Sequence, residues 1–375
     1  MKYMGSKRAM LQNGLGALLT REAASASQFV DLFSGSGAVA NYVASYVPVR
    51  VVAVDVQFYS AILAGSILNR RSKLTWHTVW DQWQRRATEN LNSRLIPVAD
   101  RLTQVVVRAA REWCEEQQCL PITRAYGGHY FSPQQAVWID SLRGTLPPHE
   151  PDRTVALAAL IKAASQCAAA PGHTAQPFQP TKGAKPFLQE AWCKDIVVRA
   201  KVAFAALAGQ FARRRGRAEV ADANEAAKRL GEGDLAFVDP PYSGVHYSRF
   251  YHVLETIAQG NCGEVSGVGR YPAPELRPHS KYSVKSQSAG ALDSLFKTIA
   301  DRDARAIVTF PDHECSNGLS GHRVHEVAAE YFKIREYSIE SKFSTLGGTG
   351  DGRKNEAGRS ARQKANELVL VLTPR

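Results

Sequence analysis

Near the start of the chain, short apolar runs alternate with helical spacing of apolar residues. Residues 28–40 read QFVDLFSGSGAVA, which is a short apolar strand that runs into a glycine turn and an alanine-rich helix start. Residues 50–56 read RVVAVDV, a second apolar run, and residues 59–69 follow with helical spacing of Ile62, Leu63 and Ile67. A strand, a turn, a helix and a second strand predict the opening of a parallel α/β sheet.

Between residues 73 and 212 the pattern changes to long helical stretches. We expect helices at about 80–91, 102–116, 132–142, 154–169 and 191–211, with breaks at Gly127-Gly128 and at the Pro-, Gly- and Thr-rich segment 171–186. Strand-like runs return at 217–220, 235–238, 304–310, 333–338 and 367–372. The pattern therefore predicts a sheet domain made of residues 1–72 and 213–375, interrupted by a mainly helical insertion at 73–212.

Two basic stretches rich in glycine or proline, residues 260–290 and 343–365, lack either pattern. We expect both to be long loops. Loops of this length inside a compact domain are usually functional or disordered.

The glycine turn predicts a nucleotide-like ligand. Gly35 and Gly37 let the backbone close tightly beneath such a ligand, and Asp55, at the end of the second strand, can accept hydrogen bonds from ribose hydroxyls. The turn alone allows NAD, S-adenosylmethionine or a purely structural role. Asp31, just before the turn, would oppose the pyrophosphate of NAD but suits the positive charges of S-adenosylmethionine, so we expect the latter.

Residues 235–242, LAFVDPPY, indicate chemistry at an amino group. The apolar strand delivers Asp239 to the carboxyl edge of the sheet, where ligands bind in such folds. Pro240 and Pro241 fix the backbone and prevent a helix from starting there. The Asp239 carboxylate and the Pro240 carbonyl can accept the two N–H bonds of an aromatic amine and stabilise the charge that develops on its nitrogen. Tyr242 can stack on a base that has been flipped out of a duplex.

Composition and charge narrow the choice of substrate. The 375 residues are 44% hydrophobic and carry a net charge of +12, which favours a polyanionic partner such as nucleic acid. The six cysteines do not have zinc-site spacing, and we expect no metal. No apolar run reaches the roughly 18–20 residues of a membrane span, and the N-terminal MKYMGSKR lacks the apolar core of a signal peptide, so we expect a cytoplasmic protein.

Taken together, these segments resemble the Dam-like family of DNA adenine-N6 methyltransferases, of the restriction–modification type. The resemblance rests on KYMGSK at 2–7, DLFSGSG at 31–37 and DPPY at 239–242, in the family's order of cofactor motif, recognition region and catalytic motif. Further similar segments are YSRFYHVLE at 247–255, YFSP at 130–133 and Ile139-Asp140. The resemblance implies a Rossmann-like class I S-adenosylmethionine-dependent methyltransferase sheet, with residues 73–212 as a helical target-recognition domain.

The resemblance also implies roles for individual residues. Lys7 would pair with the carboxylate of the cofactor, and Asp222 would lie near its adenine ring, with Glu219 as a nearby alternative. The implied catalytic residues are Asp239, Pro240, Pro241 and Tyr242. The implied cofactor-binding residues are Tyr3, Gly5, Lys7, Asp31, Phe33, Gly35, Gly37, Asp55 and Asp222. Basic and aromatic residues on the loops are expected to contact double-stranded DNA: Tyr247, Arg249, Arg270, Lys281, Arg353, Arg359 and Arg362.

Several alternatives remain open at this point. A cytosine-N4 methyltransferase would use similar chemistry, although such enzymes more often have Ser in place of the Asp. Methylation of RNA or of a protein glutamine is usually associated with Asn there. A DNA-binding protein without catalysis would have no need of the acidic and aromatic residues, and a nicotinamide dehydrogenase would not explain DPPY. The expected biological role is DNA modification, either beside a separately encoded cognate restriction endonuclease or as a phage or solitary methylase.

Overall fold

A seven-stranded sheet forms the centre of the computed structural model, which describes residues 7–91, 96–97, 102–344 and 362–375, the side chains of 340–344 and 362–366 excepted. The strand order is β3-β2-β1-β4-β7-β9-β8, and the first five of these strands run parallel. β9 is antiparallel to both β7 and β8. The strands are β1 (Gln28–Asp31), β2 (Arg50–Asp55), β3 (Arg217–Val220), β4 (Leu235–Val238), β7 (Arg305–Pro311), β8 (Phe332–Ser344) and β9 (Arg362–Pro374). This is the predicted Rossmann-like α/β fold.

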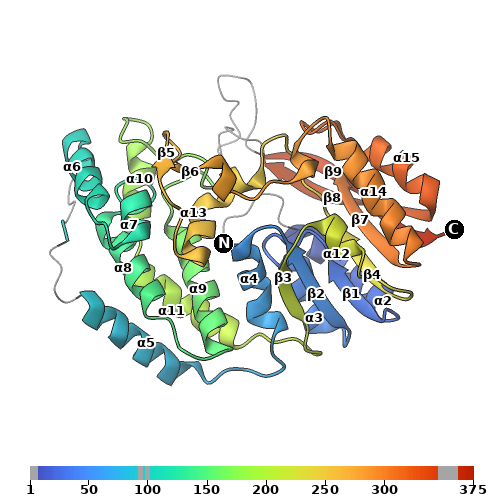
Figure 1. Cartoon of the computed structure of the whole chain (residues 1–375), viewed down its shortest axis with the longest axis horizontal. Helices are drawn as coiled ribbons and strands as arrows, with labels where there is room; N and C mark the ends of the chain where they lie inside the picture. The colour runs from blue at the N-terminus through green and yellow to red at the C-terminus, as the bar shows by residue number, and fades with distance from the viewer. Residues whose placement is uncertain (1–6, 92–95, 98–101, 345–361) are drawn as a thin grey trace.

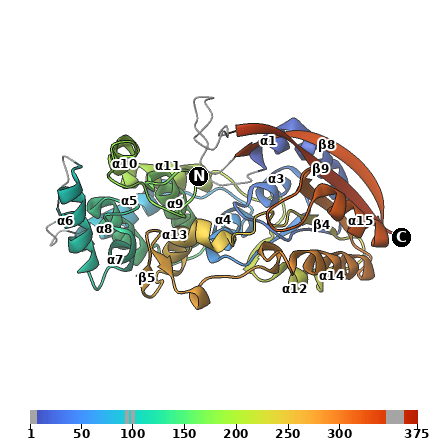
Figure 2. The same ribbon diagram turned by 90° about the horizontal axis from the view of Figure 1, so that it is seen from above.

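Helices cover both faces of the sheet (Figures 1 and 2). One face packs on α1 (Arg8–Met10), η1 (Leu11–Leu15), α2 (Gly16–Ala23) and α3 (Ala38–Tyr46). The other face packs on α12 (Ala223–Ala227), α14 (Ser288–Asp301) and α15 (Gly321–Tyr331). Because the central parallel strands are buried on both sides, β4 is a continuous apolar run without polar alternation.

The helical half of the molecule lies beside the sheet and meets it at α4 (Phe58–Leu68) (Figure 1). Side chains of α4, α9 and α13 share one apolar cluster, so the helical half packs directly on α4. The division into a catalytic domain and a recognition insertion stays a prediction. The helices of this half are α5 (Trp76–Leu91), α6 (Gln104–Glu115), α7 (Pro121–Tyr126), α8 (Pro133–Gly144), α9 (Asp152–Cys167), α10 (Lys185–Trp192), α11 (Ile196–Ala208) and α13 (Tyr247–Gln259).

All five returning strands and the five long helices form close to the predicted positions. The expected loop at 260–290 contains a small hairpin, β5 (Val265–Ser266) and β6 (Tyr271–Pro272), and two short turns, η2 (Pro274–Leu276) and η3 (Lys281–Ser283). β8 and β9 extend into the two ends of the expected loop at 343–365 and pair with each other there. Residues 345–361 lie outside the described residues. In the described part of the chain, no helix is both long and apolar enough to cross a membrane.

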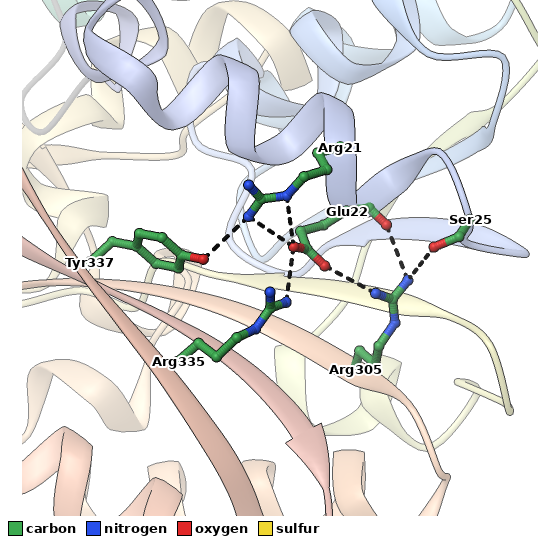
Figure 3. Close-up of polar contacts among 6 residues, drawn as sticks. All are labelled: Arg21, Glu22, Ser25, Arg305, Arg335 and Tyr337. Carbon is green, nitrogen blue, oxygen red and sulfur yellow. Dashed lines mark hydrogen bonds and ion pairs between the residues drawn. The ribbon is translucent and has the colours of Figure 1, made fainter.

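A buried carboxylate fastens α2 to the far edge of the sheet (Figure 3). Glu22 is 6% exposed and accepts hydrogen bonds from Arg305 on β7 at 3.1 Å and from Arg335 on β8 at 2.9 Å. Arg21 binds the same carboxylate at 3.1 Å and also the hydroxyl of Tyr337. These bonds fix β7 and β8 to the helix that precedes β1.

Candidate active site

Three aspartates meet at one edge of the sheet because each ends or follows a neighbouring parallel strand. Asp31 ends β1, Asp55 ends β2 and Asp239 follows β4, the strand on the other side of β1. All three line a cleft of about 970 Å³ that is partly open to solvent. The cleft lies where the chain order reverses across the sheet, the usual ligand site of open α/β folds.

The glycine turn shapes the floor of this cleft. Gly35 and Gly37 have φ angles of +49° and +72°, which side-chain-bearing residues rarely adopt. The Gly35 N–H donates to Asp55 Oδ2 at 2.8 Å, and the Gln57 N–H donates to Asp55 Oδ1 at 2.9 Å. Burial raises the pKa of Asp55. Gly35 lines the cleft, whereas Gly37 begins α3 and packs near Ala64.

Asp31 is a buried carboxylate with spare acceptor capacity. It is 1% exposed, and its Oδ2 accepts the Ala40 N–H at 3.2 Å. Its Oδ1 is buried without a hydrogen-bond partner among the described residues. Burial, and then the charge of Asp239, raises the pKa of Asp31 to about 8. A buried acceptor of this kind is stabilised by a cation placed in the cleft.

Aromatic side chains form the end of the cleft beyond the glycine turn. The ring of Phe33 meets that of Tyr282 edge-on, with centroids 5.0 Å apart. The Tyr282 hydroxyl donates to Asn224 at 2.7 Å. Asp222 lines the same end and caps α12, whereas Glu219 is absent from the lining and pairs with exposed arginines.

Asp239 is held by two donors on a single oxygen. The Lys7 ammonium lies 2.9 Å from Asp239 Oδ1, and the Thr309 hydroxyl donates to the same atom at 2.9 Å. Oδ2 accepts no hydrogen bond from the described residues. Burial raises the pKa of Asp239 to about 6, although Lys7 acts in the opposite direction.

Lys7 pairs with two carboxylates beside the cleft. It is 4% exposed, and its ammonium also donates to Glu367 on β9 at 2.8 Å. Burial lowers the pKa of Lys7, but the two carboxylates outweigh this effect and raise the pKa above its ordinary value. Two of the three ammonium donors are therefore engaged by Asp239 and Glu367, and the expected pairing with the carboxylate of a ligand stays a prediction.

The loop after β7 supports the proline turn at residues 239–242. Asn317 is fully buried and donates from Nδ2 to the Pro241 carbonyl at 2.8 Å and to the Tyr282 carbonyl at 3.0 Å. Tyr242 and Tyr247 line the cleft with their rings edge-on, 6.4 Å apart. One buried amide thus connects the proline turn to the aromatic end of the cleft.

α13, which follows the proline turn, is also tied to the glycine side of the cleft. Glu255 accepts the N–H groups of Phe58 and Tyr59 at 2.9 and 3.0 Å, and so caps the start of α4. α4 begins just after Asp55. The segments with the two motifs are therefore fixed to each other through one carboxylate.

Comparison with known proteins relates the chain to DNA methyltransferases. Residues 3–94 match the model of the D12 class N6 adenine-specific DNA methyltransferases. It is 43% identical over 68 residues to the modification methylase LlaI of Lactococcus lactis subsp. lactis, a match that covers 18% of this chain and 10% of that protein. It is 25% identical over 317 residues to the type II methyltransferase M.FokI of Planomicrobium okeanokoites, covering 79% of this chain and 42% of that protein. The chain thus spans less than half the length of these curated relatives.

The residues that were expected to contact DNA lie in different surroundings. Tyr247 lines the cleft, Arg249 is exposed on α13, and Lys281 is exposed at the start of η3. Arg270 does not line the cleft; its guanidinium donates to the carbonyls of Ala125 at 2.9 Å and Arg124 at 3.1 Å, and to Glu115 at 2.8 Å. Arg270 therefore braces the β5–β6 hairpin against α7, and its expected DNA contact finds no support. Tyr3, Gly5, Arg353, Arg359 and the side chain of Arg362 lie outside the described residues.

Proposed function

We propose that the protein is a site-specific DNA methyltransferase that transfers the methyl group of S-adenosylmethionine to the exocyclic amino group of adenine. The observation that carries the proposal is the hydrogen bonding of the two carboxylate oxygens of Asp239. Lys7 and Thr309 occupy one of its carboxylate oxygens, and the other has no hydrogen bond from the described residues, in the cleft that also contains Asp31. This arrangement suits the orientation of an amine beside a bound cation.

The lining of the cleft fits S-adenosylmethionine. When bound, this group supplies an electrophilic methyl on a positively charged sulfur. Asp31 would face its positive charges, Asp55 would accept ribose hydroxyls, and Phe33 would lie along its adenine with Asp222 nearby. The anionic pyrophosphate of NAD would meet both Asp31 and Asp239, which disfavours a nicotinamide cofactor.

The residues of the proline turn would prepare the amine. Asp239 Oδ2 and the Pro240 carbonyl would accept hydrogen bonds from its two N–H groups and favour a pyramidal nitrogen, whose lone pair is less delocalised into the ring. The negative charge of Asp239 then stabilises the positive charge that develops on nitrogen. Tyr242 would stack on the extruded base, and Tyr247 would contact its edge. Asn317 holds the Pro241 carbonyl, so the acceptors are in place before the base arrives.

The names of the relatives support a role in DNA modification. Both are described as modification or type II methyltransferases. We therefore assign this chain to a restriction–modification system, with a separately encoded endonuclease as its counterpart and residues 73–212 as the target-recognition insertion. Finding no such endonuclease gene beside it would favour a phage or solitary methylase.

A labelling experiment tests the activity. The purified protein is incubated with tritiated S-adenosylmethionine and mixed-sequence duplex DNA, and the DNA is digested to nucleosides for mass spectrometry. We expect label in 6-methyladenosine with the wild type and none with Asp239→Asn. Label in 4-methylcytosine would move the substrate to cytosine. DNA binding without label would support a catalytically inactive binding protein and overturn the proposal.

A further inference from the structure

Two arginines near the cleft pack on the same aromatic ring. Arg249 on α13 and Arg277 after η2 place their guanidinium carbons 4.6 and 5.7 Å from the centroid of the Tyr271 ring. Neither guanidinium has a hydrogen bond or an ion pair with the described residues, and the Nε of Arg277 is buried without an acceptor. Burial and then the charge of Arg249 lower the pKa of Arg277, although Glu275 acts in the opposite direction. Like charges at close range are unfavourable unless an anion compensates them.

A buried hydroxyl lines a hollow that Arg277 also lines. Ser248 is 5% exposed, and its Oγ has no hydrogen-bond partner among the described residues. Ser248 and Arg277 both line a second hollow between α13 and the segment 261–278. Glu255 also lines this hollow, but its oxygens already accept the N–H groups at the start of α4. The Ser248 hydroxyl and the Arg277 guanidinium are both donors without a partner among the described residues, which favours an anionic oxygen ligand.

This second hollow adjoins the cleft of the proposed active site. Ser248 and Pro278 line both cavities. His246 lines the cleft, and its ring lies 5.0 Å from that of His279. Burial lowers the pKa of His246, and the charges of His279 and the two arginines lower it further. These four basic side chains therefore lie close enough to interact with one another. An anion bound there would lie directly beside whatever occupies the cleft.

We propose that Arg249, Arg277 and Ser248 bind a backbone phosphate of DNA next to the nucleotide that enters the cleft. The inference rests on the proposed function and names the contact that holds the strand during base extrusion. The arginines supply charge and planar donors, and the Ser248 hydroxyl supplies a short third bond. Tyr271 holds both guanidinium groups in place through its ring, and its hydroxyl donates to the Ala175 carbonyl at 2.5 Å.

The salt dependence of DNA binding tests this site. Full-length wild type, Arg249→Gln, Arg277→Gln, Arg277→Lys and Ser248→Ala are titrated with a fluorescent duplex between about 50 and 200 mM salt. Each glutamine variant is expected to lose about one unit of slope of log K against log salt and about tenfold in affinity at 0.1 M salt. Arg277→Lys keeps the slope because it keeps the charge. Ser248→Ala lowers affinity about fivefold with the slope unchanged, since it removes a neutral donor.

Arg302→Gln is the matched control, because Arg302 is exposed at the end of α14 and lines neither cavity. Cofactor affinity is measured for every variant and should equal that of the wild type. Glutamine variants with the slope of Arg302→Gln, in a protein that still methylates DNA, would overturn the phosphate site and leave the proposed function intact. A wild type that neither binds nor methylates DNA would overturn the proposed function, and this inference with it.

Discussion

Cofactor binding should depend on pH through Asp31. The pKa of this carboxyl is about 8 in the ligand-free protein, so about 1% of it is ionised at pH 6 and about 90% at pH 9. A cationic ligand requires the ionised form and lowers the pKa on binding. Affinity for S-adenosylmethionine is therefore expected to rise by roughly 100-fold from pH 6 to pH 9, and to level off above pH 8.

Isothermal titration calorimetry of wild type and Asp31→Asn separates this effect from titration of the ligand itself. The ligand's own groups affect both proteins equally, so the ratio of their dissociation constants reports on Asp31 alone. We expect this ratio to change by roughly 100-fold between pH 6 and pH 9. At pH 7 the wild type should also release about 0.9 proton more than the variant, measured in buffers of different ionisation enthalpy.

Asp234 offers a matched control. It is 8% exposed and its pKa is also raised by burial, but it precedes β4 and so lies at the edge of the sheet opposite the cleft. The affinity ratio for Asp234→Asn should stay constant with pH. A constant ratio for Asp31→Asn across the same range would refute the assignment of Asp31 to the cationic part of the ligand.

Three further substitutions probe the structure around the cleft. Lys7→Met removes a charge that lowers the pKa of Asp239, so this pKa should rise above 6 and the acid limb of kcat should move up by at least about one pH unit. Single-turnover methylation between pH 5.5 and 9 measures the shift, and an unmoved limb would contradict the pairing. Asn317→Ala should lower kcat by about 10- to 100-fold, with cofactor affinity unchanged, because the Pro241 carbonyl loses its donor; an equal loss of affinity would indicate general damage instead. Glu22→Gln should lower the free energy of unfolding by about 2 kcal/mol in urea titration, and a stability equal to wild type would mean that its arginine bonds contribute nothing.

The three aspartates of the cleft were predictable from the sequence because each stands at the end of a recognisable apolar strand. Asp31, Asp55 and Asp239 each end or follow an apolar run, and the carboxyl ends of parallel strands meet at one edge. The glycine turn was predictable for the same reason, since its left-handed backbone angles require glycine. These residues need only the order of elements to be placed.

The partners of these residues were not predictable, because they come from distant parts of the chain. Lys7 binds Glu367, 360 residues away, and the Asn317 amide reaches the Pro241 carbonyl across 76 residues. Neither residue has a local sequence signal for its role. Arg270 shows how such partners can be missed: its place in a basic loop suggests a phosphate contact, but its guanidinium also donates to the carbonyls of Arg124 and Ala125.

Sequencing of modified DNA tests the central claim most directly. Unmethylated genomic DNA is treated with the purified protein and S-adenosylmethionine, with Asp239→Asn as the control, and is read by a method that detects methylated bases in single molecules. We predict 6-methyladenine at one short recurring sequence with the wild type and none with the variant. DNA that stays unmodified under conditions in which the wild type binds both duplex and cofactor would contradict the assignment of this cleft to adenine methylation.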